Sequence, residues 1–400
     1  MSNRDGIKVV MASFVIQLTL GICYIWSIFQ TGIAQSVFNG NNAHAALSFS
    51  LILAFLSLGS PIAGKLAAQY GTRKVVILGG IFLFVGFFLA SMANASNAWL
   101  VWIGYGVIGG IGMGLTYSTT IALAQKWFVH KKGQVTGIIV SGLGLGGVVF
   151  TPIISNLIGQ FGGVGHGELS TFRILAFLFL IVCLVGSIFL KEAPTVTSTH
   201  ATVSNNDVSP FEMVKKPSFY LLAFTFTLSV MGGLMMIGFA RPIAVARGLE
   251  STATIGVLAI ALANSMGRLC WGFISDKIGR INTILLLLLV SGLLSISVAF
   301  VQGFFIYVII ALIGFSFGGF LSTFPSLTSE LFGVKNLATN YGFVLFGFGV
   351  GAILSSQIAG HYKNIAANNI ALMSPAFFIA AGCSAIGLML MLTLKKMVRN

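Results

Sequence analysis

One arginine stands within a long apolar stretch. Arg268 lies among mainly apolar residues, and Asn264, one helical turn earlier, falls on the same helix face. Burying an arginine in a bilayer costs at least about 2.5–3.5 kcal/mol, so such a residue usually faces a cavity and marks a pathway. A guanidinium is planar, permanently charged and matched to a carboxylate by two parallel hydrogen bonds. We therefore expect Arg268 and Asn264 to line a cavity that binds a small organic anion.

A second interpretation of Arg268 is open at this stage. The residue lies only four positions before Gly272, near the end of the apolar stretch. A long basic side chain near a helix end can extend to the membrane interface while its methylene groups remain among apolar neighbours. In that case Arg268 would be an anchor and would bind no ligand.

The acidic residues and the cysteines argue against catalysis. All eight Asp and Glu fall in expected loops or at helix ends, and the sequence holds no HExxH, paired intramembrane carboxylates or Walker loop. The stretch 142–147 contains a literal GxGxxG, but it lies inside an apolar helix without a preceding strand, so it indicates close helix packing. The four cysteines show no CxxC spacing. We expect no enzyme, no cofactor and no metal site.

Four aromatic residues are further candidates for lining the cavity. Tyr24 and Tyr117 fall in the first and fourth expected helices, and a buried phenol hydroxyl needs a hydrogen-bond partner. Phe317 and Phe348 fall in the tenth and eleventh helices. In a chain with 35 Phe, packing against lipid or neighbouring helices is the alternative interpretation for each of them.

The composition tells which elements must position these residues. Hydrophobic residues make up 56% of the 400 positions and charged residues 8%, where soluble chains carry about 25% charged residues. A membrane-spanning helix needs about 20 apolar residues. The apolar runs predict an all-α membrane protein with twelve transmembrane helices in two six-helix bundles, at 8–30, 45–66, 74–94, 98–124, 133–158, 170–190, 217–240, 252–274, 281–301, 304–325, 338–361 and 373–394.

The distribution of basic residues predicts the orientation and the domains. Seventeen of the 22 Lys and Arg fall on the side of the two termini and four on the other side, which places both termini in the cytoplasm and the protein in the cell membrane. This asymmetry also explains the net charge of +14 without nucleic acid. The polar stretch 191–216 is interpreted as a cytoplasmic linker between an N-terminal bundle, 1–190, and a C-terminal bundle, 217–400.

An internal repeat connects the two halves. Gly64 to Lys74 and Gly272 to Arg280 share the spacing G-x4-[KQ]-x-G followed by basic residues, 208 positions apart. A same-side repeat indicates two parallel bundles related by an axis along the membrane normal. The second copy resembles the loop signature GxxxD(R/K)xGR of the major facilitator superfamily, which implies the two-bundle fold. The first copy departs from that signature, because Ala68 stands where the family has Asp.

Further motifs resemble the oxalate:formate antiporter family, which includes bacterial monocarboxylate carriers. They are Lys126 to Gly133, Phe324-Pro325-Ser326 and Asn340-Tyr341-Gly342. The resemblance implies that Arg268 is the ligand of the substrate carboxylate. Two departures matter: Phe348 stands where oxalate carriers have a lysine, and Asn264 where animal monocarboxylate carriers have an aspartate. One expected intramembrane cation suits a monoanion better than a dianion.

These observations lead to one expected function and two alternatives. We expect a secondary active transporter, monomeric, that moves a small monocarboxylate of the pyruvate, lactate or formate class together with a proton by alternating access. The first alternative is an organic anion exchanger of the oxalate/formate type, which needs no proton site. The second is a transporter-like sensor without flux, although the 26-residue linker contains no recognisable output domain.

Overall fold

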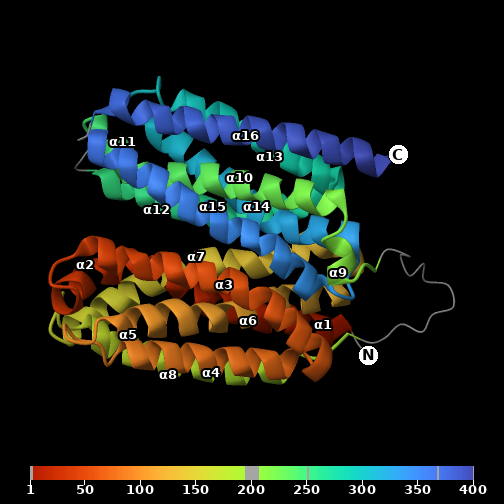
Figure 1. Cartoon of the computed structure of the whole chain (residues 1–400), viewed down its shortest axis with the longest axis horizontal. Helices are drawn as coiled ribbons and strands as arrows, with labels where there is room; N and C mark the ends of the chain where they lie inside the picture. The colour runs from red at the N-terminus through yellow and green to blue at the C-terminus, as the bar shows by residue number, and fades with distance from the viewer. Residues whose placement is uncertain (1–2, 194–206, 250–251, 367–368, 400) are drawn as a thin grey trace. The chain divides into compact units, whose positions relative to one another are not determined.

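The chain is helical throughout the part that the structure describes. The computed structural model describes residues 3–193, 207–249, 252–366 and 369–399, and these hold helices and turns but no strand (Figure 1). Eleven helices among these residues are long and apolar enough to cross a membrane. The remaining predicted span, 252–274, corresponds to α12, a helix of 26 residues that carries Arg268.

The first half of the chain forms six long helical segments. Glycine or asparagine precedes several of them, and the ends extend beyond the apolar cores because polar flanking residues continue the same helices. The segments are α1 (Asn3–Leu20) continuing through η1 (Gly21–Ile25) into α2 (Trp26–Val37), α3 (Asn42–Tyr70), α4 (Thr72–Ala90), α5 (Trp99–Val101) continuing through η2 (Trp102–Ile108) into α6 (Gly109–Trp127), α7 (Lys132–Gln160) after the short η3 (Val129–Lys131), and α8 (Glu168–Phe189).

The second half repeats this pattern. Its helices are the short α9 (Pro210–Met213), α10 (Pro217–Gly238), the short α11 (Ala240–Ala246), α12 (Ala253–Ile278), α13 (Arg280–Ser297), α14 (Phe305–Phe332), α15 (Leu337–Ala366) and α16 (Ile370–Arg399). Half of the predicted linker 191–216, residues 194–206, lies outside the described residues. The domain limits at 190 and 217 stay predictions.

Two spans depart from α-helical geometry, which the sequence did not predict. The first span tightens to a 3-10 helix over Gly21–Ile25, and the fourth widens to a π-helix over Trp102–Ile108. Such departures leave backbone carbonyls without their usual intrahelical donors and are frequent near functional sites. Tyr24, one of the candidate residues, lies within the 3-10 segment.

The helices divide into two compact units. Unit 1 comprises Met1–Val129, Leu145–Asp207 and Phe332–Phe343, and unit 2 comprises His130–Gly144, Val208–Leu331 and Val344–Asn400. Within unit 1, α3 packs against α6, and α4 packs against both α6 and α8 (Figure 1). Within unit 2, α16 packs against α10 and α13. Two helices, α7 and α15, each contribute their first residues to one unit and the rest to the other.

The glycines that end the two repeat copies have the same backbone conformation. Gly71 ends α3 with φ 85° and ψ 151°, and Gly279 ends α12 with φ 87° and ψ 146°. Both angles lie in a region that L side chains rarely adopt, so glycine is required at the two turns. The two copies of the repeat therefore end in the same kind of turn.

Candidate functional site

Arg268 is buried in unit 2. The side chain is 3% exposed and lies on α12. Its Nε donates a hydrogen bond to Oδ1 of Asn264 at 3.0 Å, and its Nη1 donates to the backbone oxygen of Val140 on α7 at 3.0 Å. The predicted shared face of Asn264 and Arg268 is therefore confirmed. The anchor interpretation requires the side chain to extend along α12 to the helix end. The side chain is instead turned toward α7, where Nη1 donates to Val140.

Glycines bring the start of α7 against α12. A Cβ added at Gly137 would lie 2.6 Å from the backbone oxygen of Arg268, and one added at Gly144 would overlap the side chain of Ser265. Gly133 makes the same kind of approach to Gly272. Small residues at such spacing let helix backbones approach closely. This close approach is what brings the Val140 carbonyl within reach of the guanidinium.

A second helix of unit 2, α14, also packs closely against α12. A Cβ added at Gly318 of α14 would lie 2.8 Å from the backbone nitrogen of Arg268 and would overlap the backbone oxygen of Asn264. Gly314, one turn earlier, approaches the backbone of Ile260 in the same way. The backbone that carries Asn264 and Arg268 is thus fixed from two sides, which restricts the orientations that the guanidinium can adopt.

Phe317 and Phe348 both pack against α10. The ring of Phe317 covers Gly233, where a Cβ would overlap it. Phe348 is 2% exposed, and its ring centroid lies 6.2 Å from that of Phe226, which in turn lies 4.4 Å from Phe324. These contacts fit the packing interpretation of both residues, and their role in binding stays a prediction.

Tyr24 and Tyr117 lie in unit 1. Tyr24 meets Phe49 of α3 edge to face, with 6.3 Å between the ring centroids. Tyr117 on α6 is 4% exposed, and its ring lies 6.4 Å from that of Tyr341 at the start of α15. Gln17 of α1 donates through Nε2 to the backbone oxygen of Tyr117 at 3.2 Å. The structure thus joins Arg268 to Asn264 within unit 2 and places the two tyrosines in unit 1.

A charged cluster of Asp276, Arg280 and Glu330 lies at the end of α12. The carboxylate of Asp276 accepts hydrogen bonds from the backbone nitrogens of Gly133 and Gln134 at 3.0 and 2.8 Å. Arg280 pairs with the same carboxylate, and its Nε lies 3.3 Å from Oε2 of Glu330. A carboxylate at the first turn of a helix satisfies N–H groups that have no intrahelical partner and complements the helix dipole. Asp276 therefore fastens the start of α7 to the end of α12.

The arrangement around Arg268 suits binding of an anion. The two hydrogen-bond acceptors described for its side chain, an amide oxygen and a backbone carbonyl, are neutral. An anion that reaches such a guanidinium can form charge-assisted hydrogen bonds, which are shorter and roughly twice as strong as neutral ones. The described residues contain no group of three or more His, Cys, Asp or Glu placed to hold a metal ion.

Many apolar helices and a buried arginine within one of them are typical of a membrane transporter. Comparison with known proteins identifies the class. The sequence model of the Major Facilitator Superfamily matches residues 9–356. The chain therefore belongs to the major facilitator superfamily, and the predicted fold class is confirmed. It is a multi-pass membrane transporter of that family.

Relatives and solved structures agree with this assignment. The chain is 34% identical over 348 residues to the uncharacterized MFS-type transporter YhjX of Escherichia coli (strain K12), covering 86% of this chain and 85% of that protein. It is 27% identical over 366 residues to the oxalate:formate antiporter of Oxalobacter formigenes, covering 87% and 84%. Among solved structures, the transporter FucP in the outward conformation superposes with a TM-score of 0.74 at 14% identity, covering 98% and 99%. This last likeness shows the fold alone.

Proposed function

We propose that the protein carries a small monocarboxylate across the cell membrane together with a proton, by alternating access, and that Arg268 binds the carboxylate. The substrate class is pyruvate, lactate or formate. The observation that carries the proposal is the buried guanidinium of Arg268, held by Asn264 and the Val140 carbonyl. A planar donor group held in this way favours one orientation of a bound carboxylate.

The relatives support the same substrate class. One is named an oxalate:formate antiporter, and another, from Xenopus laevis, is named monocarboxylate transporter 12 and is 24% identical over 394 residues, covering 92% of this chain and 83% of that protein. Both names refer to carboxylates. For orientation, the excess of Lys and Arg on the side of the termini favours cytoplasmic termini. We propose that the transporter acts as a monomer.

The second candidate is an exchanger of two organic anions, such as oxalate against formate. It is favoured by the oxalate:formate antiporter among the relatives. It differs from the first candidate in needing an anion on both sides of the membrane and no proton. Phe348, where the oxalate carriers have a lysine, favours the monocarboxylate carrier because a second cation is missing from that position.

The test is transport by the purified protein in liposomes. Uptake of labelled pyruvate, lactate, formate and oxalate is measured with and without an inward proton gradient, and with and without unlabelled formate inside. We expect a monocarboxylate to enter faster with the proton gradient and with empty liposomes. Uptake that occurs only with formate inside, and that ignores the proton gradient, would establish the exchanger instead.

Variants of Arg268 test the site. Arg268→Gln removes the charge and Arg268→Lys keeps a point charge without the planar pair of donors. Both should reach the membrane and lose most of the uptake. The matched control is Arg173→Gln, because Arg173 is an exposed arginine of α8 and should transport like the wild type. Near-normal uptake by Arg268→Gln would remove Arg268 from the site.

A further inference from the structure

The two repeat copies end in the same kind of turn but differ in charge. In the second copy Asp276 accepts hydrogen bonds from the first turn of α7, and Arg280 pairs with it. At the same spacing from the repeat glycines, the first copy has Ala68 in place of Asp276 and Thr72 in place of Arg280. The first copy therefore contains no carboxylate of its own at this position.

A helix start nevertheless lies against the first copy. A Cβ added at Gly64 would overlap the backbone nitrogen of Thr339, in the first turn of α15. The second copy makes the same kind of approach: a Cβ added at Gly272 would lie 2.5 Å from the backbone oxygen of Gly133, in the first turn of α7. The N–H groups of a first helical turn have no acceptor within their own helix. In the second copy the acceptor is Asp276.

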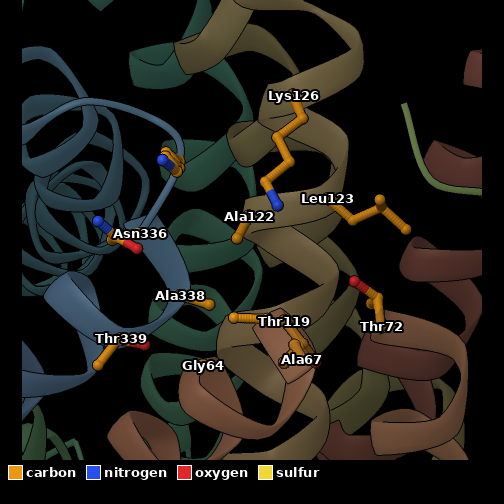
Figure 2. Close-up of a pocket in the computed structure, with 12 residues that line it drawn as sticks. Gly64, Ala67, Thr72, Thr119, Ala122, Leu123, Lys126, Asn336, Ala338 and Thr339 are labelled. Atoms are coloured by element: carbon orange, nitrogen blue, oxygen red, sulfur yellow. The ribbon is translucent and has the colours of Figure 1, made fainter. Parts of the chain in front are cut away.

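A small pocket, open to the surface at Ala68 and Lys335, lies at this place in unit 1. Its lining includes Ala68 and Thr72 of the repeat, Ala338 and Thr339 of the first turn of α15, and two lysines, Lys126 and Lys335. Figure 2 shows the Lys126 side chain turned back along its helix toward Ala122, with Thr119, Ala338 and Thr339 around the same space. Where the second copy has a carboxylate, the first has a pocket with two ammonium groups.

Two acidic groups next to the pocket accept hydrogen bonds from the backbone of its lining residues Thr72 and Lys335. Oε1 of Glu192 accepts from the backbone nitrogen of Thr72 at 2.8 Å, and Oδ1 of Asp207 accepts from the backbone nitrogen of Lys335 at 3.2 Å. Neither carboxylate is part of the pocket lining. None of the ion pairs described, Lys191 with Asp5 and Arg280 with Asp276 and Glu330, involves Lys126 or Lys335.

We propose that this pocket binds a small oxyanion, a phosphate or a dicarboxylate, between Lys126, Lys335 and the first turn of α15. The bound anion takes the part that Asp276 takes in the second copy: it accepts the N–H groups of a first helical turn and neutralises the cations beside it. This site is distinct from that of Arg268, which lies in unit 2. The concentration of the anion in solution sets the occupancy of this site. Occupancy in turn stabilises the contact of the start of α15 with α3 and α6.

The test measures binding by the purified full-length chain in detergent. Inorganic phosphate and oxalate are titrated separately by calorimetry at constant ionic strength, in the wild type and in Arg268→Gln. The Arg268→Gln background removes the proposed transport site, so a failure of the proposed function leaves this measurement intact. We expect the same dissociation constant for phosphate or oxalate in both proteins. Binding of only one of the two anions identifies whether phosphate or a carboxylate is the ligand.

Variants of the lining identify the site. Lys126→Gln with Lys335→Gln should raise the dissociation constant at least tenfold. Ala68→Asp should abolish binding, and without added anion its unfolding temperature should equal that of the wild type saturated with anion, because the new carboxylate supplies the missing acceptor. The matched control is Lys65→Gln with Lys74→Gln, two exposed lysines of the same unit that do not line the pocket. It should bind like the wild type.

Three results would overturn the proposal. The first is no binding of either anion by the wild type at millimolar concentration. The second is an equal loss of binding in the control variant, Lys65→Gln with Lys74→Gln. That result would mean that the anion is attracted by the overall positive charge of this surface and not by the pocket. The third is unchanged binding in Lys126→Gln with Lys335→Gln, a variant that keeps the backbone sequence around Ala68 intact and so remains informative if Ala68→Asp does not fold.

Discussion

The hydroxyl of Tyr105 donates a hydrogen bond of 2.9 Å to the backbone oxygen of Cys23. Tyr105 lies in the π-helical segment of the fourth span and Cys23 in the 3-10 segment of the first. The ring of Tyr105 is enclosed by Trp26 at 4.5 Å and Phe172 at 5.8 Å between centroids. A backbone carbonyl inside a membrane needs a hydrogen-bond donor, and Tyr105 supplies one to Cys23. The two irregular segments thus stabilise each other.

From this hydrogen bond we predict the effect of removing the hydroxyl oxygen of Tyr105. Tyr105→Phe keeps the ring and leaves the Cys23 carbonyl without this donor, which should lower the free energy of unfolding by about 1–3 kcal/mol. Thermal unfolding of the purified protein measures the change. Tyr220→Phe, on an exposed tyrosine of α10, is the control and should unfold like the wild type. Equal unfolding temperatures for Tyr105→Phe and the wild type would show that the bond contributes nothing.

Asp276 predicts a local change at the start of α7. Asp276→Asn replaces a charged acceptor of two backbone N–H groups with a neutral amide, at a cost of about 1.5–3 kcal/mol. The amides of Gly133 and Gln134 should then exchange hydrogen about ten to a hundred times faster, since about 1.4 kcal/mol corresponds to tenfold. Hydrogen–deuterium exchange of peptides from this region measures it.

The control for Asp276 is its neighbour in the same cluster. Glu330 contacts Arg280 but is 53% exposed in its side chain, so Glu330→Gln should change exchange little. If both variants accelerate exchange equally, the effect comes from Arg280 and the direct contact of Asp276 with α7 contributes nothing of its own.

The two candidate tyrosines predict a change in affinity. If Tyr117 or Tyr24 donates a hydrogen bond to the bound carboxylate, its replacement by Phe should weaken substrate binding by about 1–3 kcal/mol without unfolding the protein. Apparent affinity in the liposome assay and the unfolding temperature are measured together. Unchanged affinity in both variants would assign Tyr117 to packing with Tyr341 and Tyr24 to packing with Phe49.

Phe348 tests the charge argument. With Arg268 as the cation of the site, a monoanion gives a neutral complex, whereas a dianion leaves one charge unpaired, and desolvating an unpaired charge costs several kcal/mol. The wild type should prefer pyruvate or lactate to oxalate, and Phe348→Lys should shift the preference toward oxalate. The measurement is competition by unlabelled oxalate against labelled monocarboxylate uptake at neutral pH.

A control separates charge from packing at the same position. Phe348 packs against Phe226, so any change of its side chain disturbs that contact. Phe348→Met keeps an apolar side chain without adding charge and should retain the preference of the wild type. Inhibition of the wild type by micromolar oxalate would refute the single-cation argument and favour the exchanger.

The fold could be predicted to a large extent because hydropathy and basic flanks are local properties of the sequence. The pairing of Asn264 with Arg268 was predictable for the same reason, since i,i+4 residues share a helix face. The Val140 carbonyl is 128 positions from Arg268, and nothing local marks it as the partner. Tyr105 lacked a local signal too, because its role depends on a 3-10 segment in another helix.

The sharing of α7 and α15 between the two units has a consequence for biogenesis. Unit 1 includes Phe332–Phe343, which the ribosome adds more than a hundred residues after Asp207. At about 5–20 residues per second, this segment follows roughly 6–25 s later. A nascent chain that ends between these points lacks one wall of the lysine-lined pocket, and Gly64 has no helix start against it. Insertion of the first half into the bilayer therefore precedes its completion, and truncation before Phe332 leaves both units unfinished.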